Sequence, residues 1–155
     1  MTTDASGPGP AAQNDHKDPF AHFVEAQADA YDRAREEIAA GSKTSHWMWF
    51  VFPQLQGLGT SAMARRFALA DRSEASAFCD HETLGPRLIE ASEAMLDWAG
   101  TLEAEDILGR VDAMKFRSSM TLFERACAPD DRQVFSDALD GFFNGERCPL
   151  TLQRM

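Results

Sequence analysis

Two segments of the chain carry side chains that could do chemistry. The first is the aromatic segment, Ser45–Gln54, in which Trp47 and Trp49 follow His46. Indole rings can form the wall of a pocket for a flat ligand, with His46 and Gln54 as hydrogen-bonding groups. The alternative is a core segment whose indole N–H groups find partners inside the protein. Both interpretations are open, because one face can pack while the other lines a cleft.

The second segment, Lys115–Phe123, is expected to be helical. Lys115 and Ser119 are four residues apart, so they share one flank of an apolar stripe, with Ser118 beside them. An ammonium and a hydroxyl placed there could bind an anion or form a Ser–Lys dyad, and Asp112 could pair with Lys115. The alternative is a lysine that reaches past the core into solvent, and serines bonded to the preceding turn.

Gln27 and Tyr31 are polar groups within the apolar face of the first predicted helix. Because buried amides and phenols need partners, we expect both to meet polar groups of another segment, and we include them among the ligand-binding candidates. The candidates for catalysis are His46, Asp112 and Lys115. For His46, the commoner alternative is a buried, hydrogen-bonded histidine.

The cysteine pattern argues against a metal site. Cys79, Cys127 and Cys148 are widely spaced, with no Cys-x-x-Cys and no clustered histidines, so we expect three reduced thiols and no zinc. Gly41–Thr44 matches the end of a phosphate-binding loop, but the upstream glycine and the preceding strand are missing. We therefore predict neither a metal nor a cofactor.

The formal net charge is -10, from 25 acidic and 15 basic residues. Such a surface repels phosphate backbones, which argues against general nucleic-acid binding and leaves room for a local pocket for one small anion. The longest apolar stretch, Trp47–Phe52, is too short to span a membrane, and the N-terminus has no secretory signal pattern. We predict a cytoplasmic protein without membrane contact. The sequence does not determine its oligomeric state.

The elements that must position these residues are helices. Residues 1–17 lack the apolar side chains that would offset the entropy of ordering, so they are predicted to be a disordered tail. Residues 18–155 are predicted to form a single compact globular domain, mainly α, with about six to eight helices and room for minor β or irregular segments. The first helix is expected to begin with Asp18 as N-cap and to end near Gly41.

The aromatic segment is apolar on every side, so it is either a short buried helix capped by Thr44 or Ser45, or a buried strand ended by Pro53. A helix is favoured because its neighbours are helical. The other predicted helices are a stretch through Phe67, a short helix capped by Ser73, Pro86 to Gly100, Glu103–Leu108, Arg110 to Cys127, and Asp130 to Phe143.

Several motifs resemble a known bacterial family, domain of unknown function 1810. They are Phe23-Val24-Glu25-Ala26-Gln27, Tyr31, the run from Gly41 to Gln54, and Lys115 to Phe123, within a similarity that covers Asp18 to the C-terminus. The resemblance implies a compact, mainly helical fold and little about activity. The label "calpastatin" sometimes given to the family has no basis here, since such an inhibitor would be a long, disordered repeat chain. A shorter stretch, Ala113–Phe116, is similar to domains named for links to NAD and ADP-ribose.

Two functional hypotheses follow. The first is a small-molecule or anion-binding pocket between the aromatic segment and the Lys115–Phe123 helix, for a nucleotide or an ADP-ribose-like ligand. In its enzyme version, Asp112 or Glu25 assists N-glycosidic cleavage while Lys115 holds phosphate. The second is a non-enzymatic protein-interaction module with a purely structural aromatic core. The observation that would separate them is whether His46, Gln54, Lys115 and Ser119 meet in one pocket.

Overall fold

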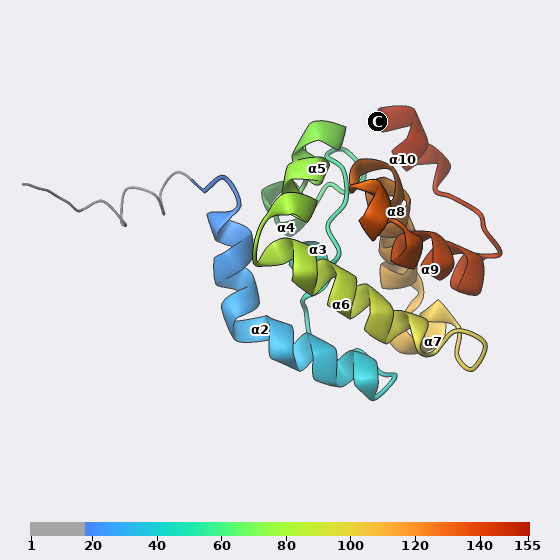
Figure 1. The fold of residues 1–155 in the computed structure, drawn as a ribbon. Helices are drawn as coiled ribbons and strands as arrows, with labels where there is room; N and C mark the ends of the chain where they lie inside the picture. Colours follow the sequence, from blue (N-terminus) through green and yellow to red (C-terminus); the bar gives the residue numbers. More distant parts are fainter. Residues whose placement is uncertain (1–17) are drawn as a thin grey trace, which may run out of the picture.

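The computed structural model describes residues 18–155, and within them the chain is a mainly α protein, as predicted (Figure 1). The described residues form nine α-helices, one more than the upper end of the predicted range, together with a 3-10 turn and an isolated parallel bridge between Leu55 and Leu69. The predicted tail, 1–17, lies outside the described residues. In chain order the helical elements are α2 (Ala21–Ala39), α3 (Met48–Val51), α4 (Ala62–Arg66), α5 (Arg72–Asp80), α6 (Leu84–Leu96), α7 (Ala104–Leu108), α8 (Arg110–Ala126), η1 (Pro129–Asp131), α9 (Gln133–Phe143) and α10 (Pro149–Arg154).

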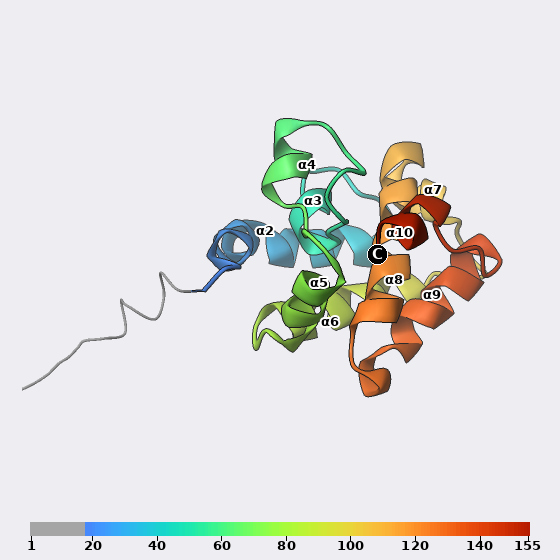
Figure 2. The same cartoon turned by 90° about the horizontal axis from the view of Figure 1, so that it is seen from above.

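Helix α8 lies at the centre of the packing, where it contacts α5, α7, α9 and α10 (Figure 2). Phe116, Met120 and Phe123 are fully buried along it, at the three- and four-residue spacing that places them on one face. The ring of Phe116 lies 4.9 Å from that of Phe52, which packs the aromatic segment against α8. The central helix therefore holds the two predicted site segments next to each other.

The centre of the aromatic segment, Met48–Val51, forms the four-residue helix α3, as favoured from the sequence, and Pro53 follows shortly after its end. Met48, Phe50 and Val51 are buried in it. Neither Thr44 nor Ser45 caps this helix; Trp47 occupies the N-cap position and makes no side-chain cap hydrogen bond. The capping prediction was wrong because the loop hydroxyl of Ser45 donates to a carboxylate of α2 instead.

Other helix boundaries also differ from the predictions. Helix α2 begins at Ala21, and Asp18 accepts a hydrogen bond from the N–H of Phe20 at 2.9 Å and contacts His81. Asp71, not Ser73, caps α5 by accepting from the N–H of Glu74. Helix α6 begins at Leu84, before Pro86, and α10 was not predicted. The starts of α2, α5 and α6 each differ by less than one turn, where the partner of a cap decides the boundary, whereas α10 is a six-residue helix without a predicted counterpart.

The prediction of three reduced cysteines is wrong for two of them. Cys79, near the end of α5, is disulfide-bonded to Cys127, the C-cap residue of α8, and their Cα atoms lie 5.6 Å apart. Cys148 is free. Because the two cysteines are 48 residues apart in the sequence, no short motif predicts that they pair. The packing of α5 on α8 brings the two sulfur atoms together. Among residues 18–155, no helix is both long and apolar enough to cross a membrane.

Candidate functional site

One carboxylate, that of Glu37 on α2, organises the loop before the aromatic segment. Its Oε1 atom accepts hydrogen bonds from the N–H groups of Thr44 (2.8 Å) and Ser45 (3.0 Å) and from the indole N–H of Trp47 (2.9 Å). Its Oε2 atom accepts from the Ser45 hydroxyl at 2.6 Å. Burial by itself would raise the pKa of Glu37, but these hydrogen bonds outweigh it and lower the pKa to about 2. Glu37 therefore holds the Trp47 ring in place as an ionised group.

Five side chains meet where this loop faces α8, and we call them the lysine–tryptophan cluster: Lys43, Trp47, Trp49, Asp112 and Lys115. The Lys43 ammonium lies 2.9 Å from Asp112 Oδ2, and the Lys115 ammonium lies 3.5 Å from Asp112 Oδ1. Lys43 stands over the Trp47 ring at 5.2 Å, and Lys115 over the Trp49 ring at 5.0 Å. Two ammonium groups thus share one carboxylate and two indole faces, which are favourable positions for cations.

Trp49 supplies an unusual group within the lysine–tryptophan cluster. Its side chain is half-buried, and its Nε1 atom is buried with no hydrogen-bond partner among the described residues. By contrast, the indole N–H of Trp47 is satisfied by Glu37. A buried donor without an acceptor costs about 1–3 kcal/mol, so Trp49 is a position where a ligand acceptor would be stabilised.

The two serines of the second predicted segment point to different surroundings. Ser118 is buried, and its hydroxyl donates to the Met114 carbonyl (3.2 Å) and lies 3.3 Å from the Cys148 sulfur. This is the bond to the preceding turn that was given as the alternative interpretation. Ser119 is fully buried, and its hydroxyl has no hydrogen-bond partner among residues 18–155.

Gln27 and Tyr31 meet polar groups of other segments, as expected. The amide of Gln27 donates to the Phe50 carbonyl at 2.7 Å and accepts from Arg87 at 3.4 Å, which ties α2 to the aromatic segment. The Tyr31 hydroxyl donates to Glu90 Oε1 at 2.6 Å and lies 3.0 Å from the Arg87 carbonyl oxygen. Burial, and then the Glu90 carboxylate, raise the pKa of Tyr31. Both side chains therefore have internal roles that account for their burial.

His46 and Gln54, near the two ends of the aromatic segment, are more accessible to solvent than Gln27 and Tyr31. The side chain of His46 is exposed and that of Gln54 is half-buried. The backbone carbonyl of Gln54 accepts from the N–H of Leu69 at 2.9 Å, beside the parallel bridge. The Lys115 ammonium therefore lies beside Trp49 and Asp112, whereas the backbone of Gln54 is bonded to Leu69.

A cavity of about 380 Å³ lies between α7, α8 and α9. Ala113, Met114, Phe142 and Phe143 form its apolar part, and Arg110 is among its charged residues. Neither the aromatic segment nor Lys115 lines this cavity. Within the described part of the chain, no group of three or more His, Cys, Asp or Glu residues is arranged to hold a metal ion.

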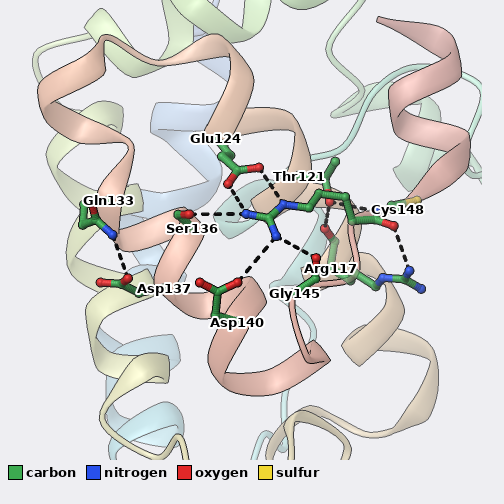
Figure 3. Close-up of polar contacts among 10 residues, drawn as sticks. Arg117, Thr121, Glu124, Gln133, Ser136, Asp137, Asp140, Gly145 and Cys148 are labelled. Carbon is green, nitrogen blue, oxygen red and sulfur yellow. Dashed lines mark hydrogen bonds and ion pairs between the residues drawn. The ribbon is translucent and has the colours of Figure 1, made fainter.

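A second polar cluster, absent from the sequence predictions, joins α8, α9 and the loop before α10 (Figure 3). The Arg147 guanidinium contacts the carboxylates of Glu124 and Asp140 and the Gly145 carbonyl. The hydrogen bond from Arg147 is the largest cause of the lowered pKa of the Glu124 carboxyl. Nearby, the Thr121 hydroxyl accepts from the N–H of Cys148 at 3.0 Å. These bonds hold the C-terminal segment on α8, and the ionic partners satisfy each other without a ligand.

Comparison with known proteins gives two matches. A family model described as "Protein of unknown function (DUF1810)" matches residues 17–155. The crystal structure of the conserved hypothetical protein Rv1873 from Mycobacterium tuberculosis is similar, with 43% sequence identity and a TM-score of 0.83 over 88% of this chain and 96% of that chain. No curated protein matches the chain.

Proposed function

The chain belongs to the DUF1810 family, described as proteins of unknown function, and we propose that it binds a small anionic ligand at the lysine–tryptophan cluster. A nucleotide or an ADP-ribose-like molecule suits this site, because such a ligand has both a flat ring and a negatively charged phosphate. The function proposed is binding by a helical domain, with the anion near the two ammonium groups and the ring against an indole.

The observation that carries the proposal is the pairing of Lys115 with the half-buried Trp49. The ammonium stands 5.0 Å from the ring, and the indole N–H beside it is buried and unpartnered among the described residues. A phosphate or carbonyl oxygen that approached both groups would gain a charge-assisted hydrogen bond and would satisfy the orphaned donor.

The positive charge of the lysine–tryptophan cluster supports the binding of an anion. Two of the chain's three lysines lie in the lysine–tryptophan cluster, although the whole sequence has a net charge of -10. Asp112 offsets only one of these two positive charges. The exposed fractions of the Lys43 and Lys115 side chains are 10% and 24%, so solvent screens their charges less than it screens fully exposed ones.

The geometry supports binding more than the enzyme version. Both oxygens of Asp112 already lie near lysines, and Glu25 is exposed on α2, so neither is a free carboxylate in the cluster. His46, the other candidate for catalysis, is exposed. N-glycosidic cleavage can still be checked in the binding samples by chromatography of the released base.

The test is a fluorescence titration of the tryptophans with ADP-ribose and a set of nucleotides, at low ionic strength. A ligand that covers Trp49 should change the emission of the parent protein. The Lys115→Met variant keeps an unbranched apolar side chain over the ring and removes the charge, so we expect its affinity to fall about tenfold or more.

Arg66→Met is the matched control, because Arg66 also stands over an aromatic ring, Phe67, at 5.2 Å, but outside the cluster. This control should bind the ligand as the parent does. Equal affinity of Lys115→Met and parent for every ligand that changes the emission would exclude the proposed site. Recovery of a stoichiometric protein partner, with no response to any of these metabolites, would instead favour the protein-interaction module.

A further inference from the structure

Three arginines gather at the C-terminal end of α8, on the surface where α5 packs beside it. They are Arg72 at the start of α5, Arg125 in the last turn of α8, and Arg132 just after η1. Arg72 donates to the Arg125 carbonyl at 2.8 Å, and Arg132 donates to the Cys127 carbonyl at 2.6 Å. These two bonds hold the guanidinium groups near the negative end of the α8 dipole.

None of these three guanidinium groups has an ion-pair partner within residues 18–155. Arg147, by contrast, has ion-pair partners. It lines an adjoining cavity together with Glu124, Arg125 and Arg132. In that cavity, Arg147 is paired with Glu124 and Asp140 (Figure 3). On a protein of net charge -10, these three arginines are positive charges that the described residues do not neutralise, whereas the neighbouring Arg147 is paired.

The three arginines line an open groove of about 720 Å³, which we call the arginine groove. Its α5 wall presents the hydroxyls of Ser73 and Ser76 and the methyl group of Ala77, which share a helix face with Arg72 by their spacing. Asp80 is the only carboxylate among its lining residues, so the formal charge of the lining is +2. The Cys79–Cys127 bond ties α5 to the end of α8 and so holds the two walls at a constant separation.

We propose that the arginine groove binds the phosphate group of a small phosphomonoester. A phosphomonoester carries about 1.5 to 2 negative charges at pH 7 and three acceptor oxygens, which match a lining charge of +2, guanidinium donors and two hydroxyls. Arginine presents a planar fork of N–H groups that suits phosphate and stays charged at any physiological pH. A small molecule fits better than a nucleic acid, because the acidic remainder of the surface repels an extended phosphate backbone.

The experiment is isothermal titration calorimetry at low ionic strength, with phenyl phosphate and inorganic phosphate as probes. The parent should bind phenyl phosphate, and an equal affinity for inorganic phosphate would show that the phosphate group alone is recognised. Arg125→Gln removes one guanidinium from the groove and should weaken binding about tenfold. Its loss should leave the fold intact, because this guanidinium has no ion-pair partner within residues 18–155. An unchanged thermal unfolding midpoint would verify the intact fold.

Two controls make the location specific. Arg33→Gln removes an exposed arginine of α2 that does not line the arginine groove and has no ion-pair partner within residues 18–155, and it should leave the affinity unchanged. Asp80→Asn removes the one negative charge of the lining and should strengthen binding about threefold, an effect that a purely structural role of the arginines does not produce. Lys115→Met should not affect the affinity for phenyl phosphate. The proposal for the arginine groove is therefore tested separately from the proposal for the lysine–tryptophan cluster. No heat with the parent, parent-like affinity in Arg125→Gln, or no gain in Asp80→Asn would overturn the proposal.

Discussion

At the scale of single residues, Glu37 is the group that determines how the aromatic segment is presented. It accepts four hydrogen bonds from three residues, Thr44, Ser45 and Trp47, and all of them come from the loop that leads into α3. One carboxylate thus fixes the loop before the aromatic helix, which has no side-chain cap of its own. The backbone N–H groups of Thr44 and Ser45 and the Ser45 hydroxyl require acceptors, and this requirement is the feature of the sequence that could have indicated such a carboxylate.

Glu37→Gln tests this role. An amide cannot accept these hydrogen bonds as an ion, so we expect the free energy of unfolding at pH 7 to fall by about 2 kcal/mol, a typical value for hydrogen bonds to a charged group. Chemical denaturation followed by circular dichroism measures this change. Glu36→Gln, at the exposed neighbouring position, should differ little from the parent.

The stabilisation that the Glu37 carboxylate gives to the parent protein should depend on pH. The folded-state pKa of Glu37 is about 2, below the ordinary value of 4.5, so its stabilisation is complete above pH 4.5 and is lost as the pH falls through the folded value. The stability difference between parent and Glu37→Gln should therefore shrink from pH 4.5 towards pH 2. A difference that stayed constant over this range would contradict the role of the ionised carboxylate.

At the scale of elements, the turn between α5 and α6 depends on a glycine. Gly85 is buried in the first turn of α6, and a Cβ atom built on it would overlap the carbonyl oxygen of Cys79 and lie 3.0 Å from its carbonyl carbon. Both are backbone atoms, which cannot rotate out of the way. The two helices can therefore approach this closely only with glycine at this position.

Gly85→Ala should lower the free energy of unfolding by about 2 kcal/mol, the usual cost of forcing extra atoms into a packed region. Gly141→Ala in α9 is the matched control. Its Cβ would meet only the Ala99 methyl group at 3.0 Å and the end of Leu96 at 3.6 Å, and alanine favours a helix more than glycine does. Thermal unfolding of both variants should separate them, and equal midpoints would refute the close approach of α5 and α6.

At the scale of the whole molecule, the Cys79–Cys127 bond closes a loop that contains all of α6, α7 and α8. In the chain-entropy account, cross-linking two residues 48 positions apart stabilises the fold by about 4 kcal/mol, since it restricts the unfolded chain. We expect a reducing agent to lower the free energy of unfolding of the parent by up to this amount.

Cys79→Ser provides the control, because it has already lost the bond and a reductant should leave its stability unchanged. A thiol assay on the unfolded, unreduced parent should find one free thiol, Cys148. Three reactive thiols in that assay would mean that the bond is absent from the purified protein.

The sequence by itself determined those features that depend on near neighbours in the chain. The three- and four-residue spacing of apolar side chains was enough to predict the mainly α class and the long helices α2 and α8. The helical neighbours made a helix the better prediction for the aromatic segment, whose own apolar pattern left helix and strand open. Burial of Gln27 and Tyr31 on an apolar face was enough to predict that each would have a partner elsewhere.

The tertiary structure alone decided which groups meet. Lys43 and Lys115 share Asp112, and Cys79 bonds Cys127, because the loop before α3 and helix α5 both pack against α8. The pairing of Lys115 with Asp112 could be predicted from the sequence, since three residues form about one helical turn. The positions of Lys43 and Glu37 beside the aromatic segment could not. Contacts between segments tens of residues apart depend on how helices pack, and no local spacing records that. For the same reason, the arginine groove has no signature in the chain.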